Sequence, residues 1–323
     1  MDNLTHSLTG LFLSRAGLNR ITPLATPLLL IAVNLPDLDI LSGLAGPVTY
    51  LHWHRHLTHS LLFAPVLAFT LVLLLRLFRP GLALLPAMAV ALVGVLSHLL
   101  LDLTNIYGVR IFLPLRDTWY HWDLTPVIDL WIWIALGIAV AGPFLARLVG
   151  SEIGESRSTS GGRGFAIAAL LFVTLYNGGR ALLHNRVLQT LNSREYAGAA
   201  PIRVAAFPFA VNPLRWHAVA ETDSAYRLFN FNLPMAFNPA LSEIVEKASP
   251  SPALEGASRT EPFRVMANFA LYPVYRVIPR AEPDGGFQVE LSDLRFPFTS
   301  TALLNRQNQV EKSSFSFGSG LPR

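Results

Sequence analysis

The chain has 323 residues and is strongly apolar, since 52% of its residues are hydrophobic and only 14% are charged. Soluble domains carry about 25% charged residues, so this shortage of charge indicates contact with lipid. The formal net charge of +4 comes almost wholly from arginines dispersed along the chain, a pattern that argues against nucleic acid as a partner. The chain contains no cysteine, which excludes disulfides, thiolate zinc sites and cysteine nucleophiles.

The first elements predicted are two short helices that form a hairpin. Residues 4–17 show helical apolar spacing, residues 17–22 break it, and residues 23–35 resume a helix-length apolar run. At ~1.5 Å rise per residue each piece reaches only about 20 Å. A bilayer has a hydrocarbon core of about 30 Å. We therefore expect this hairpin to enter the membrane without clearly spanning it.

Four longer apolar segments follow, and each approaches the roughly 20 residues that a helix needs to cross a bilayer. They are residues 61–79, 82–101, 126–146 and 165–183. Pro80 and Gly81 predict a tight turn between the first two. A polar loop rich in Gly and Ser, residues 150–164, separates the last two. Residues 1–185 are thus predicted to form a mainly α, polytopic membrane domain of about four spans plus the N-terminal hairpin.

Composition changes after about residue 186, and short β-type segments separated by Pro, Asn and Gly become frequent. They are residues 202–209, 216–220, 227–233, 264–277 and 287–294. Residues 248–262 are expected to be a flexible connection within this part of the chain. We predict a strand-rich, water-exposed domain over residues 186–323.

Histidines and aspartates interrupt the apolar half at several places. They are His6, Asp37 and Asp39 in N-L-P-D-L-D, His54 and His59 in the cluster at 52–60, and His98 and Asp102 in S-H-L-L-L-D. His98 and Asp102 are four residues apart, so a helix presents both on one face, as two ligands of one metal require. An ionisable pair within an apolar span is costly and is functional by default.

The predicted hairpins place these groups at one end of the bundle. His6 begins the first short helix, and Asp37 follows the end of its partner. His59 precedes the span 61–79, while His98 and Asp102 close the antiparallel span 82–101. Because antiparallel pairs return to the level at which they started, separate regions of sequence are predicted to converge in one layer.

Imidazole and carboxylate together suit Zn²⁺ best, with Mn²⁺ and Fe²⁺ as alternatives, and suit the all-oxygen shells of Ca²⁺ and Mg²⁺ less well. A bound divalent ion lowers the pKa of its water from about 15.7 to about 7, which supplies hydroxide at neutral pH. The predicted ligands are His6, Asp37, His59, His98 and Asp102. Asp39 and His54 are predicted to be further ligands or the general base, and Arg55 to pair with an anionic substrate group such as phosphate.

Each signal also has a structural interpretation. His6 alone is typical of a helix cap, Asp37 and Asp39 after a proline are typical of a turn, and His52 is typical of an interfacial anchor. The residues His121, Asp123 and Asp129 return to the same end of the bundle and are candidates for a supporting or substrate-side role. The tryptophans beside them indicate an aromatic belt at the membrane surface.

These motifs resemble the YdjM-type membrane-bound metal-dependent hydrolases, a family described as LexA-binding and inner-membrane-associated. The matching residues are Thr5-His6, Pro36-Asp37-x-Asp39, His54-Arg55-x-x-Thr58-His59-Ser60 and His98-x-x-x-Asp102. The resemblance is strongest over residues 1–130, while Asn212-Pro213-x-x-Trp216 and Asp293–Arg295 match the tail of extended members. Where the family pattern has Gly after His-Arg, this chain has His56, which either adds a ligand or crowds the turn. The resemblance implies a hydrolase without fixing its substrate.

The predicted function is therefore metal-dependent hydrolysis at the membrane interface, on a lipid or phosphoester substrate. Two alternatives remain open, a transporter or metal-handling protein and a non-catalytic scaffold with a structural metal. A transporter would need polar groups through the depth of the membrane, whereas the middles of the segments 61–79 and 126–146 contain almost no polar residues. The predicted location is the bacterial inner membrane. With seven arginines at the end opposite the site and six at the site end, the positive-inside rule only slightly favours an outward-facing site.

Overall fold

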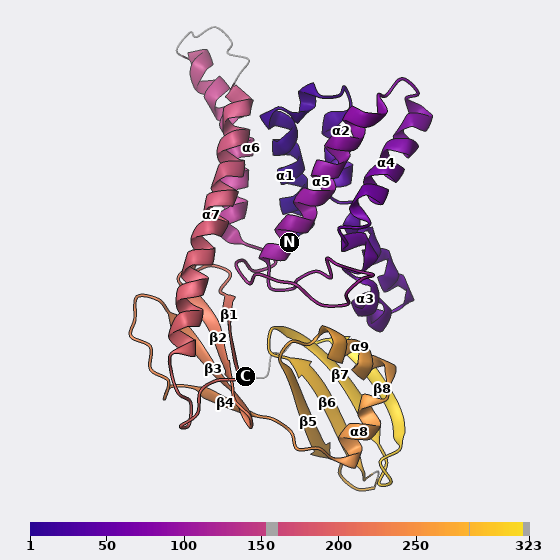
Figure 1. The fold of residues 1–323 in the computed structure, drawn as a ribbon, viewed down its shortest axis with the longest axis vertical. Helices are drawn as coiled ribbons and strands as arrows, with labels where there is room; N and C mark the ends of the chain where they lie inside the picture. Colours follow the sequence, from indigo (N-terminus) through magenta and orange to yellow (C-terminus); the bar gives the residue numbers. More distant parts are fainter. Residues whose placement is uncertain (153–160, 284, 319–323) are drawn as a thin grey trace.

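A computed structural model describes residues 1–152, 161–283 and 285–318, and Figure 1 shows a helical N-terminal half joined to two antiparallel sheets. This arrangement confirms the predicted fold class. The helices α1 to α5 form one group of rods, and α6 and α7 form a second column beside them (Figure 1). The two sheets lie at the same end of the molecule, and the last turns of α7 run alongside the first of them (Figure 1).

The N-terminal hairpin consists of α1 (Asn3–Ala16) and α2 (Ala25–Ala32), with the short 3₁₀ helix η1 (Leu18–Arg20) between them. Asp2 caps α1 by accepting a hydrogen bond from the backbone N–H of Thr5, and Gly17 ends the helix at a φ of 152°. After α2 the chain bends by 44° into the 3₁₀ helix η2 (Pro36–Ala45). The predicted hairpin is therefore present, and its second arm leads directly to Asp37.

Two short elements, α3 (Pro47–Trp53) and η3 (Leu57–His59), lead into the second hairpin. Its first arm is α4 (Ala64–Phe78). A bend of 83° separates the segment Pro47–His59 from α4. The antiparallel partner of α4 is α5 (Leu84–Thr104), and α6 (Leu130–Glu152) and α7 (Gly161–Asn192) complete the helical half.

Among the described residues, three helices are long and apolar enough to cross a membrane, or up to five crossings if each bent pair is one span. The three are Leu84–Thr104, Leu130–Val149 and Gly162–Asn192. The helix α4 has only 15 residues, fewer than expected from the apolar run at 61–79, because residues 61–63 form turns before it. The expected number of about four spans falls within this range.

Close helix contacts bring α1, α2 and α5 together near the polar residues. An added Cβ at Gly94 on α5 would lie 2.7 Å from the Cβ of Ala32, and one at Gly10 on α1 would lie 2.9 Å from Cγ2 of Val33. Real Cβ contacts are longer, so only glycine allows these backbones to approach so closely. The core between these helices is built from small and branched apolar side chains, among them Leu28, Leu29, Ala87, Val90 and Ala91.

The first sheet has the order β1-β2-β3-β4 with every pair antiparallel. Its strands are β1 (Arg203–Pro208), β2 (Arg215–Glu221), β3 (Ala225–Asn232) and β4 (Glu243–Glu246). The last turns of α7 pack on one face, where Val187 and Leu191 join Trp216 and Phe229 in a core. Because α7 continues unbroken to Asn192, the domain boundary at 185/186 lies inside a helix and stays a prediction.

The second sheet has the order β5-β6-β7-β8, again antiparallel throughout. Its strands are β5 (Pro273–Pro279), β6 (Phe287–Asp293), β7 (Phe296–Leu304) and β8 (Val310–Phe317). Two helices, α8 (Pro252–Ser258) and α9 (Glu261–Phe269), share a buried core with this sheet.

Two local expectations for this half were wrong. Residues 264–277 do not form one strand, because α9 runs to Phe269 before β5 begins. Phe263, Met266 and Phe269 recur every three residues and are all buried, which is the spacing of a helix face. Residues 248–262 are not a simple flexible connection, since Ser251 caps α8 within them. Residues 153–160 of the predicted polar loop lie outside the described residues.

An ion pair between Asp293 and Arg295 ties the second sheet to the helical half. Arg295 Nη2 lies 2.8 Å from Asp293 Oδ2, and both side chains are buried. The same guanidinium donates to the carbonyls of Ile106 and Phe269, at 3.0 and 2.9 Å. Asp293 Oδ2 also accepts from the backbone N–H of Leu271 at 3.0 Å. The charges of this pair are thus matched by hydrogen bonds.

Candidate metal centre

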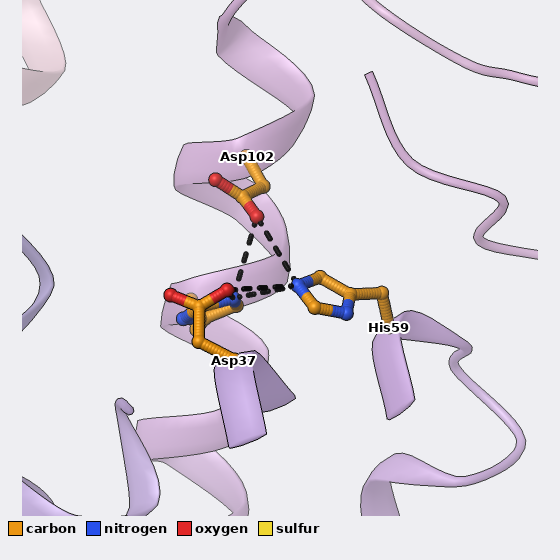
Figure 2. Close-up of side chains that lie close together, drawn as sticks. Asp37, His59 and Asp102 are labelled. Carbon is orange, nitrogen blue, oxygen red and sulfur yellow. Dashed lines mark hydrogen bonds and ion pairs between the residues drawn. The ribbon is translucent and has the colours of Figure 1, made fainter. Parts of the chain in front are cut away.

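Three elements bring the ligand candidates together. His98 and Asp102 lie one turn apart on α5, Asp37 lies in the first turn of η2, and His59 ends η3. Figure 2 shows Asp37, His59 and Asp102 directed toward one point, with dashed lines joining them. His59, His98 and Asp102 are fully buried.

Four side-chain atoms form a compact set, namely Asp37 Oδ1, His59 Nε2, His98 Nε2 and Asp102 Oδ2. The two imidazole nitrogens are 3.1 Å apart. Asp37 Oδ1 lies 3.4 Å from His59 Nε2 and 3.7 Å from His98 Nε2. Asp102 Oδ2 lies 3.4 and 3.3 Å from the same two nitrogens.

These distances match those between ligands that share a metal. Tetrahedral ligands at about 2.0–2.1 Å from Zn²⁺ are separated from each other by roughly 3.3–3.4 Å. Two neutral imidazole nitrogens and two carboxylate oxygens also form a donor set typical of transition metals. The four atoms therefore fit a single divalent ion without rearrangement of the backbone.

The second nitrogen of each imidazole is held by a fixed acceptor. His98 Nδ1 lies 2.7 Å from the carbonyl oxygen of Val33, and His59 Nδ1 lies 3.2 Å from Asp39 Oδ2. His59 Nδ1 also lies 3.1 Å from the hydroxyl of Thr58, which itself donates to Asp39. With Nδ1–H directed at these acceptors, the lone pair of each Nε2 points to the centre. Partners of this kind fix the orientation of metal-binding histidines and increase their basicity.

Asp39 is a hub of hydrogen bonds beside the four-atom set. It accepts from the backbone N–H of Arg55 at 2.8 Å and from the hydroxyl of Thr58 at 2.9 Å. His54 Nδ1 lies 2.8 Å from its other oxygen. Asp37, Asp39 and His54 also form a second group whose ligand atoms lie within 4.8 Å of one another. The predicted residues Asp39 and His54 are thus part of the same site.

Arg55 supports Asp102 at the carboxylate oxygen that does not face His59 and His98. Its Nη2 donates to Asp102 Oδ1 at 2.9 Å, and its Nη1 donates to the carbonyl of Gly108 at 2.9 Å. Asn105 Nδ2 and the amino group of Met1 also donate to Asp102 Oδ1. Arg55 is 3% exposed and has a φ of 57°, a backbone conformation that few non-glycine residues adopt. Oδ1 is therefore occupied by donors, while Oδ2 faces the two imidazoles.

His6 completes the cluster from α1. Its ring stacks on that of His98 with centroids 3.9 Å apart, and its Nε2 lies 3.4 Å from Asp102 Oδ1. The side chain is fully buried, and neither ring nitrogen has a hydrogen-bond partner within the described part of the chain. A buried imidazole without partners is costly. His6 lies beside the four-atom set without belonging to it, and its role as a ligand stays a prediction.

The remaining candidates lie elsewhere. His52 and His56 stack on each other with centroids 5.9 Å apart, and neither belongs to the four-atom set. His121 Nδ1 pairs with Asp123 Oδ1 at 2.8 Å. Asp129 accepts from the backbone N–H groups of Trp131 and Ile132, so it caps α6.

Sequence reasoning did not assign roles to two supporting groups. Asn105 follows Asp102 by three residues and donates to its carboxylate, a spacing that could have indicated the contact. The carbonyl of Val33 orients His98, but a backbone acceptor carries no signal in the sequence.

The fold and the site define an integral membrane protein with a buried His/Asp cluster that could hold a metal ion. The family model described as YdjM inner membrane protein matches residues 1–187. The chain belongs to this family, and it is a protein of the inner membrane.

A curated relative is similar over a shorter stretch. The uncharacterized protein YfhP of Bacillus subtilis (strain 168) is 30% identical over 109 residues. This match covers 33% of the present chain and 32% of that relative, so it spans about a third of each protein. No solved structure matches the chain.

Proposed function

We propose that this protein is a metal-dependent hydrolase that acts at the membrane interface on a lipid or a phosphoester substrate. The observation that carries the proposal is the four-atom set of Asp37, His59, His98 and Asp102, with spacings of 3.1 to 3.7 Å for five of its pairs. Asp102 Oδ2 is buried without a hydrogen-bond donor among the described residues. A cation would satisfy this oxygen and both Nε2 lone pairs together.

These four residues would hold the ion, and Zn²⁺ fits their nitrogen and oxygen donors best, with Mn²⁺ and Fe²⁺ as alternatives. When bound, such an ion lowers the pKa of a water molecule to about 7 and polarises an ester or phosphoryl oxygen. Val33 and Asp39 keep the imidazoles in the tautomer that binds a metal.

His54 is the proposed general base. Its Nδ1 is held by Asp39 at 2.8 Å, and its ring centroid lies 6.0 Å from that of His59. The side chain retains some exposure, and its Nε2 makes no hydrogen bond to the described residues. The pair of Asp39 and His54 can therefore accept a proton at Nε2 beside the metal ligands.

For Arg55 we propose a different use from the one its sequence motif suggested. Its guanidinium is buried against Asp102, Asn105 and Gly108, so it balances the charge of the Asp102 carboxylate and fixes its orientation. This balance matters because three carboxylates lie in one buried cluster. The role of Arg55 toward a substrate anion stays a prediction.

The surroundings of Asp37 and Asp39 favour a lipid substrate. Exposed apolar side chains of η2 alternate with these carboxylates and continue beyond them, namely Leu38, Ile40, Leu41 and Leu44, which are 54, 56, 60 and 89% exposed. In an inner-membrane protein such side chains belong in the hydrocarbon or at its surface. A substrate that reaches Asp37 past η2 would therefore come from the bilayer.

The test combines metal analysis with a hydrolase screen on detergent-purified protein. We expect about one equivalent of a transition metal, and loss of this metal in His98→Ala. The control is His217→Ala, because His217 is a histidine of β2 outside the cluster. The same preparations are screened with phospholipid vesicles and soluble phosphodiesters. Full metal content in His98→Ala, or turnover of soluble esters alone, would contradict the proposal.

A scaffold with a structural metal is the second candidate, and the number of protein donors favours it. Structural zinc sites are closed by four protein ligands, whereas catalytic sites keep one position for water. Stoichiometric metal without turnover of any phosphoester, together with loss of folding on metal removal, would support the scaffold.

A further inference from the structure

A second site lies on the other side of α5 from the metal centre. It is a cavity of about 590 Å³ between the end of α5, the loop around Trp122 and one face of α7. The lining residues on α5 are Leu100, Leu101 and Thr104, which at 3.6 residues per turn lie on a different side of the helix from His98 and Asp102. The cavity is therefore separated from the four-atom set by α5 itself.

One long face of α7 forms the opposite wall. Its lining residues run from Val173 to Leu188 with helical spacing, a distance of roughly 22 Å at ~1.5 Å per residue. Within the described chain α7 packs mainly on α6 and α1. Val173, at one end of the cavity face, is buried in a core shared with α1 and α6, whereas Thr174, Gly178 and Asn185 on the same face are exposed. A single leaflet of a bilayer has a hydrocarbon depth of about 15 Å, half of the ~30 Å core, so this face is long enough to hold one acyl chain.

The polarity of the wall changes along its length. Leu100, Leu101 and Val173 line one part, while His121, His184 and Asn185 line the part toward the sheets together with Leu188. Between them, Asn177 lines the cavity with an amide oxygen that is buried and has no hydrogen-bond partner among the described residues. An apolar trough with a polar end matches an amphiphile.

The neighbouring surface indicates where such a molecule would come from. Leu100, which lines the cavity on α5, is 54% exposed. Both α5 and α7 are long and apolar enough to cross the membrane. The cavity therefore opens toward a lipid-facing surface at Leu100.

From this placement we infer that the cavity between α5 and α7 is a binding site for one acyl chain of a membrane phospholipid, with the polar head beside His121 and His184. The site goes beyond the proposed hydrolase function and does not depend on it, because none of its lining residues belongs to the four-atom set. A lipid in this cavity would contact α5, the helix that carries His98 and Asp102, on the side lined by Leu100, Leu101 and Thr104.

Two adjacent glycines provide a matched pair of variants. A Cβ added at either Gly178 or Gly179 meets nothing within 4 Å, so a larger side chain is tolerated at both. Gly178 lines the cavity, whereas Gly179 is not among its lining residues. Gly178→Phe therefore fills the proposed lipid site, and Gly179→Phe places the same side chain on the neighbouring position of the same helix.

The experiment uses the full chain in phosphatidylethanolamine and phosphatidylglycerol vesicles that contain a phospholipid with a diazirine in one acyl chain. Illumination is expected to label peptides from Leu100–Thr104 and Val173–Leu188. Labelling of these peptides should fall about tenfold in Gly178→Phe and stay at the wild-type level in Gly179→Phe, a difference that corresponds to about 1.4 kcal/mol. Should Gly178→Phe fail to fold, Ala181→Phe, which also lines the cavity, replaces it.

Several outcomes would overturn the inference. Equal labelling in wild type, Gly178→Phe and Gly179→Phe would show only the general lipid layer around the protein. Absence of lipid label at these peptides in the wild type, with label elsewhere on the chain, would show that protein and not lipid covers the cavity. Metal content is measured in each variant, so a failure of the lipid site is distinguished from a failure of the proposed metal centre.

Discussion

The metal centre and the Asp293–Arg295 pair are both buried groups of charged side chains, but they satisfy their charges differently. Arg295 donates to both oxygens of Asp293 and to two backbone carbonyls. In the candidate metal centre, by contrast, carboxylate oxygens face the imidazole Nε2 atoms of His59 and His98. The ring nitrogens of His6 and the Oδ2 atom of Asp102 have no hydrogen-bond partner among the described residues.

This difference shows how a structural cluster is distinguished from a binding cluster. A buried ion pair with complete hydrogen bonds needs nothing further, and its burial is a matter of stability. A buried set with a surplus of acceptors is costly unless a cation joins it. Variants of the two clusters should therefore change different quantities, stability for the pair and metal affinity for the centre.

The largest effect on stability is expected from Asp293→Ala. Removal of the carboxylate leaves Arg295 buried without its partner, which should lower the free energy of unfolding by about 3–5 kcal/mol. Thermal unfolding of the full chain in detergent measures the change. Metal content per folded molecule should remain that of the wild type, and its loss would show that the two clusters are coupled.

For the metal centre, Asp37→Ala is expected to weaken metal binding more than about 100-fold, since it removes one of the four donor atoms. Loss of a supporting residue alone costs about 10–100-fold. Titration against a chelator of known affinity gives the value. If the variant binds metal as tightly as the wild type, the ion is held by other residues.

A smaller loss of metal affinity is expected from Asp39→Ala, about 10–100-fold, because Asp39 orients His59 without belonging to the four-atom set. Hydrolysis, where it is observed, should fall further than affinity because His54 loses its partner as well. Metal titration and turnover of the same preparation test this expectation. A drop as large as that of Asp37→Ala would make Asp39 a ligand.

The smallest effect is expected at Glu221, which pairs with Arg203 and Lys247 on the first sheet. Burial alone would raise the pKa of Glu221, but hydrogen bonds from Lys247 and Arg203 outweigh it and hold the pKa below its ordinary value. The stabilisation is thus present above the unfolded pKa of about 4.3 and is lost as the pH falls through the folded pKa.

Glu221→Gln should therefore lower the stability by less than about 1 kcal/mol at neutral pH and by less still in acid. Melting temperatures of variant and wild type at several pH values give the comparison. A difference that grows toward low pH would contradict the sign of this pKa shift.

The sequence predicted the elements with strong periodicity and missed those that depend on tertiary contacts. The long apolar runs became α5, α6 and α7, because burial in lipid or core allows few alternatives. The run of aromatic and β-branched residues after Arg264 favoured a strand by composition, although the helical spacing of Phe263, Met266 and Phe269 decided its structure. The strands β7 and β8 were not recognised, since Ser, Thr and charged residues occupy many of their positions.

At the site, the residue spacing predicted which regions of the chain meet, but it did not predict which side-chain atoms contact one another. The proximity of His98 and Asp102 was predictable from the sequence because α5 presents residues four apart on one face. The guanidinium of Arg55 is directed inward to Asp102. This orientation depends on the positive φ at Arg55 and on contacts with Asn105 and Gly108, which lie more than 40 positions away in the sequence. No local pattern carries that information.

The unbroken course of α7 has a mechanical consequence. Its 32 residues extend for roughly 48 Å, about 18 Å more than the ~30 Å hydrocarbon core. The excess is occupied by the turns that hold the first sheet through Val187 and Leu191. Because the helix has no break, the first sheet moves with α7 as one rigid piece.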